Sequence, residues 1–230
     1  MLSPDADIFD GDCFASALRR NRQLVQSFCN RILFMKHKQK IGLFGGSFDP
    51  VHLAHDALAR HALNQFQLDR VIWIPAFISP FKINANKQVA PEQRLAMVRL
   101  VCDSEPRFEV SSYEMDKRDI SYSVDTLRYF QKVYSDAQFF WILGSDALTR
   151  IQEWKEADVL MQELTFLVAG RGGKITDLSA KVKWQTIQMD CQPISSSEIK
   201  SGLSQGKYWD QIDPEVAAYI RAHRLYGAAA

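Results

Sequence analysis

One stretch of this 230-residue sequence decides its fold: Ile41-Gly42-Leu43-Phe44-Gly45-Gly46-Ser47-Phe48-Asp49-Pro50-Val51-His52-Leu53-Ala54-His55. The apolar run at its start is long enough for one buried strand, which we predict over residues 41–44. Two glycines and a serine follow, where the backbone can turn tightly and come close to a ligand. After the Asp-Pro turn, an apolar periodicity predicts a helix over about residues 52–66.

Two histidines mark the start of that predicted helix. His52 and His55 are three residues apart, so their imidazoles lie on one face of the first turn. Amide N–H groups, the helix dipole and ring N–H donors then point the same way, which favours an anion such as phosphate. Zinc is the rival ligand, but no third or fourth metal ligand is evident nearby, and we expect no protein metal site. The turn matches neither G-x-G-x-x-G nor a P-loop, which argues against a dehydrogenase and a Walker-type ATPase.

Strand and helix patterns alternate from residue 40 onward. Further strands are predicted at 71–74, 108–112, 139–143, 164–169 and 184–189. Helices are predicted from residue 91, over 123–134 and 147–162, and twice near the C-terminus. This alternation is typical of an α/β fold with a doubly wound, mainly parallel, Rossmann-like sheet. Ligands bind such sheets beyond the carboxyl ends of the strands, where loops 45–52, 75–82, 144–146 and 170–173 are expected.

Composition excludes several classes of protein. The net charge of +1 gives no global attraction to nucleic acid or membranes, and neither is expected as a partner. The four cysteines lack paired-ligand spacing, so we expect free thiols in a reducing compartment. No apolar run approaches the length of about 18 residues that spans a membrane, and the acidic start does not resemble a secretory signal. We therefore expect a cytoplasmic protein, whose oligomeric state the sequence does not indicate.

Residues 1–38 differ from the rest, so we expect an N-terminal extension followed by one domain over 39–227. Apolar residues at roughly helical spacing alternate with arginines between Ala15 and Met35. Two interpretations stay open: an amphipathic helix that docks on the domain or on a partner, and a dispensable segment ahead of a natural start at Met35. We expect a chain that begins at Met35 to keep full activity.

A second candidate anion site lies near the C-terminus, in Ile194-Ser195-Ser196-Ser197-Glu198-Ile199-Lys200. Ser195 and Glu198 form a capping-box pattern, which predicts a helix start. The serines could act only as caps. However, one cap needs a single hydroxyl, and the additional serines with Lys200 give a second anion cradle. Two helix N-termini aimed at one place suit a polyphosphate.

Other residues are individually ambiguous. Lys82, Lys87 and Arg94 could supply positive charge to the site or belong to a solvated loop. Trp154 could be a core residue or a stacking platform for a flat ring. Asp146 follows a strand and a Gly-Ser turn, so it could accept bonds from ribose hydroxyls or cap the next helix.

Together these motifs resemble the bacterial nicotinate-nucleotide adenylyltransferases, in the nucleotidyltransferase superfamily marked by (H/T)-x-G-H and I-S-S-T-x-I-R. The resemblance covers about residues 40–227. It is carried by the 45–55 and 194–200 motifs, Ser121-Tyr122-Ser123-Val124-Asp125-Thr126-Leu127, Gly144-Ser145-Asp146, Glu153-Trp154 and the tail from Val216 to Tyr226. The Ser-Tyr-Ser segment and the tail favour this branch over the pantetheine-phosphate branch.

The resemblance implies transfer of AMP from ATP to nicotinate mononucleotide, giving nicotinate adenine dinucleotide and pyrophosphate. It places the ATP phosphates on His52, His55, Ser196 and Lys200, and the adenylate ribose near Gly144 and Asp146. It places the mononucleotide phosphate at Gly46 and Ser47 with Lys82 nearby, and the pyridine ring among Tyr122, Ser123 and Trp154. Gly45, Phe48 and Ser195 are also expected to bind substrate.

The implied chemistry needs no general base, because the attacking phosphate is already ionised at pH 7. Positioning and electrostatics carry the in-line transfer. A Mg²⁺ ion is expected, held mostly by the triphosphate and water.

Three departures from the family pattern are present: Ala54 for glycine, Phe81 for a frequent histidine, and Lys200 for arginine, which gives up the bidentate fork. The alternatives are the same chemistry on nicotinamide mononucleotide or phosphopantetheine, and a non-catalytic nucleotide-binding module. An assay of pyrophosphate release with each acceptor distinguishes them.

Overall fold

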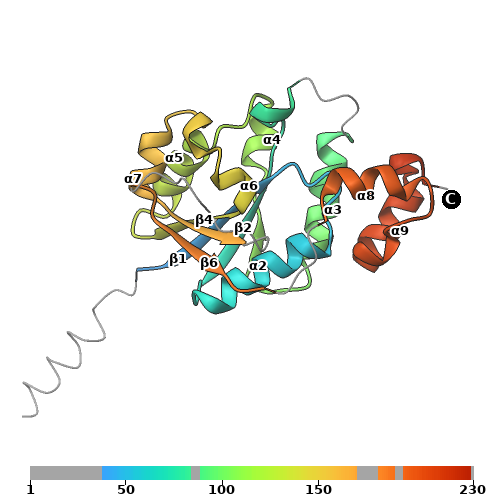
Figure 1. Cartoon of the computed structure of the whole chain (residues 1–230), viewed down its shortest axis with the longest axis horizontal. Helices are drawn as coiled ribbons and strands as arrows, with labels where there is room; N and C mark the ends of the chain where they lie inside the picture. The colour runs from blue at the N-terminus through green and yellow to red at the C-terminus, as the bar shows by residue number, and fades with distance from the viewer. Residues whose placement is uncertain (1–37, 84–88, 170–180, 190–193, 229–230) are drawn as a thin grey trace, which may run out of the picture. The chain divides into compact units, whose positions relative to one another are not determined.

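A six-stranded sheet forms the centre of the computed structural model, which describes residues 38–83, 89–169, 181–189 and 194–228 (Figure 1). In spatial order its strands are β3 (Phe108–Val110), β2 (Arg70–Pro75), β1 (Lys40–Gly46), β4 (Gln138–Gly144), β5 (Thr165–Ala169) and β6 (Trp184–Ile187). All neighbouring strands are parallel. The chain proceeds outward from β1 in one direction and from β4 in the other, so the carboxyl ends of β1 and β4 form the switch point where ligands bind.

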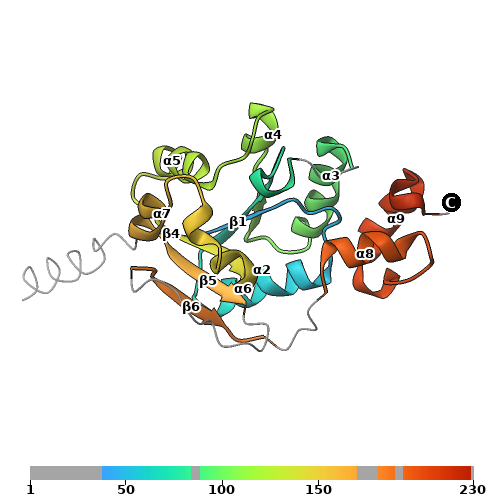
Figure 2. The same ribbon diagram turned by 45° about the horizontal axis from the view of Figure 1, so that its top comes forward.

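Helices cover both faces of this sheet, as predicted for a doubly wound fold (Figure 2). Side chains alternate between the faces along each strand: Phe44 packs on one side of β1, and Ile41 and Leu43 pack on the other. The first face carries α2 (Leu53–Gln65) and α3 (Pro91–Cys102). The helices α8 (Ser196–Leu203) and α9 (Pro214–Ala222) belong to the same core cluster but lie beyond α3, against which α9 packs (Figure 1). The second face carries α5 (Ser123–Val133), α6 (Ser145–Leu148) and α7 (Ala157–Glu163).

Gly45 and Gly46 of the opening motif belong to β1, which continues to Gly46 rather than ending at residue 44 as predicted. Their lack of a side chain is explained by packing. A Cβ atom on Gly45 would lie 3.0 Å from the Trp141 ring, and one on Gly46 would lie 2.9 Å from the Phe48 ring. Aromatic rings therefore rest directly on the backbone at the carboxyl end of the central strand.

The single helix predicted over residues 147–162 is wrong. The segment is divided into α6, the short 3-10 helix η2 (Ile151–Glu153) and α7. Trp154 has extended backbone angles, and Glu156 is left-handed at φ 53°, so neither can continue a helix. The break leaves Trp154 in a loop beside the end of β4.

Other boundaries differ by a few residues, and α4 (Tyr113–Lys117) was not predicted. The strands predicted at 108–112 and 184–189 end at Val110 and Ile187. Short 3-10 turns complete the order: η1 (Pro80–Lys82), η3 (Trp209–Gln211) and η4 (Leu225–Gly227).

Some sequence-based expectations lie outside the described residues: the extension up to residue 37, Lys87 and the loop 170–173. Within the described ranges, no helix combines the length and the apolar character that crossing a membrane requires.

Candidate active site

The N-terminus of α2 presents the two histidines side by side. His52 was predicted as the first helical residue and is instead the N-cap, one position before α2 begins, and His55 is the third residue of the helix. Their ring centroids are 3.7 Å apart, so the predicted juxtaposition of the two imidazoles is confirmed. His52 is buried and His55 is half-buried.

The hydrogen bonding of His55 fixes its role as a donor. Its Nδ1 atom accepts the backbone N–H of His52 at 3.3 Å, so a neutral ring carries its proton on Nε2. Burial first, and then the neighbouring His52 and Lys82, lower the pKa of His55 well below its usual value. A neutral imidazole with an Nε2–H group is therefore available at the mouth of the helix.

Phe48 holds the loop that leads into this helix. Its φ of 47° is unusual for a residue with a side chain. The ring is buried and packs edge-on against Phe44 and His55, with centroids 5.3 and 5.1 Å away. Aromatic packing of this kind overrides the local backbone preference and fixes the loop between β1 and α2.

Two cavities meet at this loop. The first, which we call the histidine cavity, has a volume of about 420 Å³, a size typical of small-molecule sites. It is lined by Gly45, Gly46, Phe48, His52, His55, Lys82, Gly144, Asp146, Ser195 and Ser196, among others. Ten of the predicted site residues thus converge on one space.

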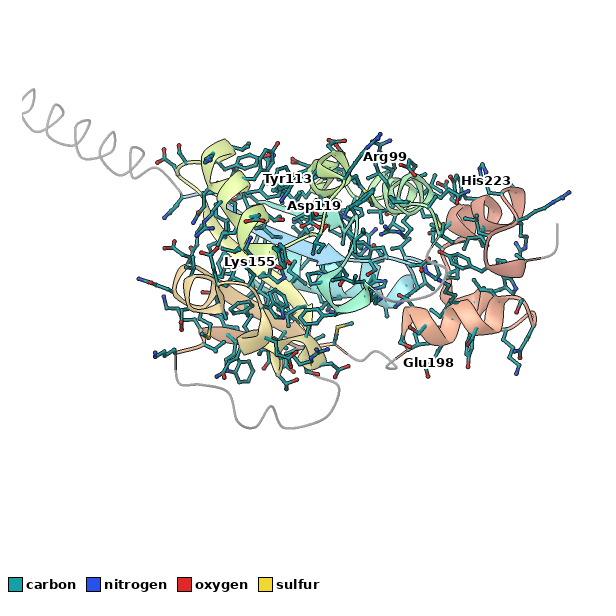
Figure 3. All side chains as sticks on the ribbon, turned by 90° about the horizontal axis from the view of Figure 1, so that it is seen from above. Arg99, Tyr113, Asp119, Lys155, Glu198 and His223 are labelled. Carbon is teal, nitrogen blue, oxygen red and sulfur yellow. The ribbon has the colours of Figure 1, made fainter. Side chains whose placement is uncertain are left out.

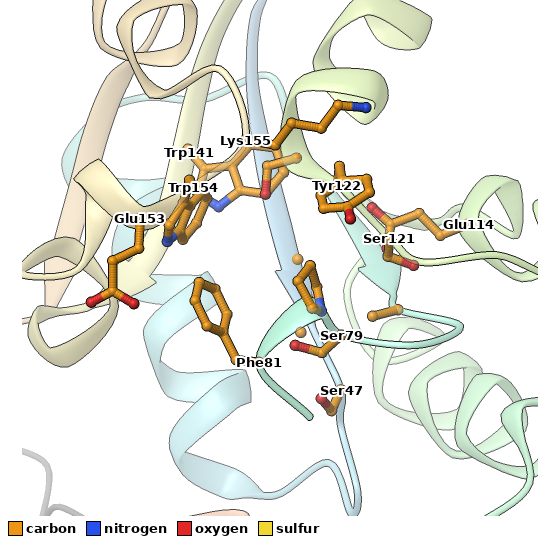
Figure 4. Close-up of a pocket in the computed structure, with 15 residues that line it drawn as sticks. Ser47, Ser79, Phe81, Glu114, Ser121, Tyr122, Trp141, Glu153, Trp154 and Lys155 are labelled. Atoms are coloured by element: carbon orange, nitrogen blue, oxygen red, sulfur yellow. The ribbon is translucent and has the colours of Figure 1, made fainter. Parts of the chain in front are cut away.

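The second cavity, which we call the tryptophan cavity, has a volume of about 320 Å³. Its walls include Ser47, Tyr122, Ser123, Trp141 and Trp154. Figure 4 shows the Trp154 and Phe81 rings on one side and Tyr122 on the other. Gly45 and Gly46 line this cavity as well as the histidine cavity, so the end of β1 is a shared wall.

The start of α8 is occupied by its own capping box, as the sequence predicts. Glu198 accepts the Ser195 N–H and hydroxyl at 2.9 and 2.7 Å, and the Ser195 hydroxyl accepts the Glu198 N–H. The Ser196 hydroxyl donates to the Pro50 carbonyl at 3.1 Å, which ties α8 to the loop before α2. These hydroxyls border the histidine cavity but already have partners within the protein.

Lys200 is paired with a carboxylate that the sequence analysis did not single out. Its ammonium lies 2.6 Å from the buried Asp49 carboxylate. The other oxygen of Asp49 accepts the Tyr226 hydroxyl at 2.8 Å. Burial first, and then Asp49, raise the pKa of Tyr226, so the hydroxyl keeps its proton. The lining of the histidine cavity does not include Lys200, and its proposed contact with phosphate stays a prediction.

Lys82 contributes a cation to the lining of the histidine cavity, whereas Ser47 lines the tryptophan cavity. Although part of its side chain meets solvent, burial lowers its pKa, an effect that Asp49 opposes. Asp146 is exposed in the first turn of α6, and Gly144 is the N-cap residue of that helix. Their contacts with ribose stay predictions.

Comparison with known proteins identifies the family. A cytidylyltransferase-like family model matches residues 43–202. A protein of Opitutus terrae, named probable nicotinate-nucleotide adenylyltransferase, is 37% identical over 193 residues, which cover 81% of this chain and 97% of the relative. The chain belongs to the nicotinate-nucleotide adenylyltransferase family. A Neisseria gonorrhoeae protein of the same name is 34% identical over 204 residues, 82% of this chain and 98% of the relative.

Solved structures agree with this family at the level of the fold. The Plasmodium falciparum nicotinic acid mononucleotide adenylyltransferase complexed with NaAD has a TM-score of 0.69 and 20% identity. The match covers 83% of this chain and 98% of that one. The same protein complexed with APC gives a TM-score of 0.68 over the same coverage. These structures bear on the fold, and the relatives above show that the chain is an enzyme of the nucleotidyltransferase class, as its motifs indicate.

Three residues of this adenylyltransferase site were missed or given another role. Asp49 lies inside the opening motif and Tyr226 inside the tail motif, but nothing in the sequence pairs residues separated by 177 positions. Arg94 was considered a source of charge for the cavity. It is instead buried and donates only to backbone carbonyls among the described residues.

Proposed function

We propose that this chain transfers AMP from ATP to nicotinate mononucleotide, giving nicotinate adenine dinucleotide and pyrophosphate. The observation that carries the proposal is the pair of cavities joined along Gly45 and Gly46. In this transfer the phosphate of the mononucleotide must lie next to the α-phosphate of ATP. Ligands in the two cavities could meet in this way along the wall that Gly45 and Gly46 share. Membership of the adenylyltransferase family supplies the substrate class.

The histidine cavity suits ATP. The neutral Nε2–H of His55, the second imidazole of His52 and the positive end of α2 face a space that Lys82 also borders. These groups donate to phosphate oxygens and stabilise charge that develops on the leaving pyrophosphate. They act as donors rather than bases, because the attacking phosphate oxygen carries no proton that must be removed.

The tryptophan cavity suits the mononucleotide. Trp154 and Tyr122 offer flat apolar surfaces to the pyridine ring, while Ser47 lies at the shared wall beside the reacting phosphate. Lys155 lines the same cavity and lies over the Tyr122 ring, 4.5 Å from its centroid, so it brings positive charge that would favour an acceptor carrying a carboxylate. Holding both substrates in line accounts for most of the acceleration in such a reaction.

We further propose that Mg²⁺ enters with the nucleotide. Among the described residues, no group of three or more His, Cys, Asp or Glu side chains is placed to hold a metal ion. A Mg²⁺ ion bound chiefly by triphosphate oxygens and water fits such a site, where it would neutralise the charge of the polyphosphate.

One assay tests the reaction. The full chain, ATP and Mg²⁺ are incubated with nicotinate mononucleotide, nicotinamide mononucleotide or phosphopantetheine, and pyrophosphate release is followed with a coupled enzyme. We expect the highest kcat/KM with nicotinate mononucleotide. Preference for another acceptor overturns the substrate assignment. ATP binding without pyrophosphate release from any acceptor overturns catalysis.

A further inference from the structure

Arg94 is buried more completely than any other charged side chain that the structure describes, with 1% of its surface exposed. Its guanidinium donates four hydrogen bonds, all to backbone carbonyls. Nη1 donates to Ser47 and Ala76 at 2.7 Å each, Nη2 to Phe77 at 3.0 Å, and Nε to Val89 at 3.1 Å. One side chain of α3 thus joins three separate loops.

Two of the carbonyl groups that Arg94 holds belong to the wall of the tryptophan cavity. Ser47 and Ala76 line that cavity and are not among the lining residues of the histidine cavity. Phe48 and His52, from the same loop as Ser47, line the histidine cavity instead. Ala76 also donates its N–H to the carbonyl of Gly46 at 2.8 Å, which joins the loop after β2 to the shared wall. A change at Arg94 is therefore transmitted first to the cavity that accepts the mononucleotide.

Arg94 also influences the position of the segment that carries Ser121 and Tyr122, because the peptide bond is planar. A carbonyl that turns toward Arg94 directs the following N–H group in the opposite direction. Because the Ala76 carbonyl faces Arg94, the N–H of Phe77 points away and donates to the Ser121 hydroxyl at 3.0 Å. Ser121 precedes Tyr122, so the guanidinium indirectly positions the aromatic wall as well.

The guanidinium is suited to this position by shape and by charge. Its planar fork donates several bonds in fixed directions, whereas a lysine ammonium would offer fewer donors on a flexible stem. Burial lowers the pKa of Arg94, and the nearby Asp49 carboxylate opposes this shift. Leaving any of the four carbonyls without a donor would cost free energy and release its loop.

We propose that Arg94 is the positioning residue of the mononucleotide site: it fixes the loops of the tryptophan cavity and thereby sets affinity for the acceptor without contacting it. The proposal rests on the function assigned to the two cavities above. It predicts an effect confined to one substrate, which distinguishes it from a general contribution to folding.

The test is calorimetric binding of nicotinate mononucleotide and, separately, of a non-hydrolysable ATP analogue to the full chain. Arg94→Lys is expected to weaken mononucleotide binding by at least about tenfold and ATP-analogue binding by less than about threefold. The matched control is Arg99→Lys in the same helix, because Arg99 is exposed at the periphery of the structure (Figure 3). It should leave both affinities unchanged.

Each result has a defined meaning. Equal weakening of both ligands, or no weakening of either, overturns the role of Arg94. Failure of the unsubstituted chain to bind nicotinate mononucleotide counts instead against the proposed function. If Arg94→Lys does not fold, Arg94→Ala is prepared with ethylguanidinium, which matches the atoms removed beyond Cβ and can refill the vacated space. Mononucleotide affinity should then rise with ethylguanidinium concentration while ATP-analogue affinity stays constant, and absence of that difference overturns the proposal.

Discussion

The N-termini of α2 and α8 share one capping hydrogen bond but differ in the charge of the side chain that accepts it. In each, the side chain of the third helical residue accepts the N–H of the N-cap residue: Nδ1 of His55 in α2 and Oε2 of Glu198 in α8. The carboxylate of Glu198 leaves a negative charge at its helix end. The imidazole of His55 leaves a neutral ring with a second N–H group. Capping by histidine therefore satisfies the backbone and still provides a donor for a ligand.

The lysines near the two helices also differ in whether they contact the protein or line a cavity. Lys200 of α8 is paired with Asp49, whereas Lys82 borders the histidine cavity and adds to the effect of burial and His52, which lower the pKa of His55. The α8 end is mainly satisfied within the protein, and the α2 end lines the histidine cavity with both of its imidazoles. The comparison shows that two anion-site patterns of similar appearance in a sequence can serve different purposes.

The largest expected effect comes from removing the donor at α2. His55→Ala should lower kcat in the pyrophosphate-release assay by at least about a hundredfold, or about 2.7 kcal/mol, because one donor to the transferring phosphates is lost. His61→Ala in the same helix, where the histidine is exposed, should leave kcat unchanged. A wild-type rate in His55→Ala would remove the functional distinction between the two helix ends.

A sharper version of that experiment converts one cap into the other. His55→Glu supplies the side chain found at the equivalent position of α8, so it should retain the capping bond while placing negative charge against the phosphates. We expect the urea midpoint of unfolding to change little and kcat to fall at least as far as in His55→Ala. Retained activity would show that the ring N–H is not needed.

The next effect concerns the ion pair at α8. Lys200→Met leaves the buried Asp49 carboxylate with the Tyr226 hydroxyl and a long bond from Val89, so the free energy of unfolding should fall by about 2 kcal/mol. Urea denaturation measures this, with the exposed Lys207→Met as control. An unchanged free energy of unfolding together with lost activity would instead indicate that Lys200 binds the substrate.

Loss of the α8 cap should have a smaller effect and leave catalysis intact. Glu198→Ala removes the acceptor for the Ser195 N–H, and we expect about 1 kcal/mol less stability. We expect kcat to stay within about threefold of its original value, since the Glu198 carboxylate caps its own helix and donates nothing to a phosphate. Glu215→Ala, near the start of α9, is a suitable control because the cap there is provided by Asp213.

The smallest effect is the dependence of stability on pH. The pKa of His55 lies well below its ordinary value in the folded chain. As the pH falls below about 6.5, the unfolded chain gains a proton on this histidine and the folded chain does not, so stability decreases. His55→Gln should flatten urea-derived stability between pH 5.5 and 7, and His61→Gln should not. An unchanged slope in His55→Gln would mean that His55 is not held neutral.

Features encoded locally could be predicted from the sequence. The capping box at Ser195, the paired imidazoles and the apolar strands depend on spacing within a few residues, and all are present. The cavities could be anticipated because the carboxyl ends of parallel strands meet at one edge.

Features that depend on distant packing could not be predicted. Phe48 adopts a left-handed backbone because its ring is buried among other rings, against the ordinary preference of phenylalanine. The helix expected around Trp154 is interrupted by the extended backbone of Trp154 and the left-handed backbone of Glu156, and the spacing of apolar residues does not indicate either conformation. In the sequence, nothing distinguishes Arg94 from an arginine on the surface. Its four carbonyl partners become evident only when the loops are seen in the folded structure.

The bond between Tyr226 and Asp49 has a consequence for the time at which the site is completed. During synthesis, the opening motif emerges long before its partner, which follows 177 residues later. Until that tyrosine is available, the Asp49 carboxylate lacks its hydroxyl donor. The loop between β1 and α2 is therefore finished only after residue 226 has left the ribosome, long after the loop itself has been made.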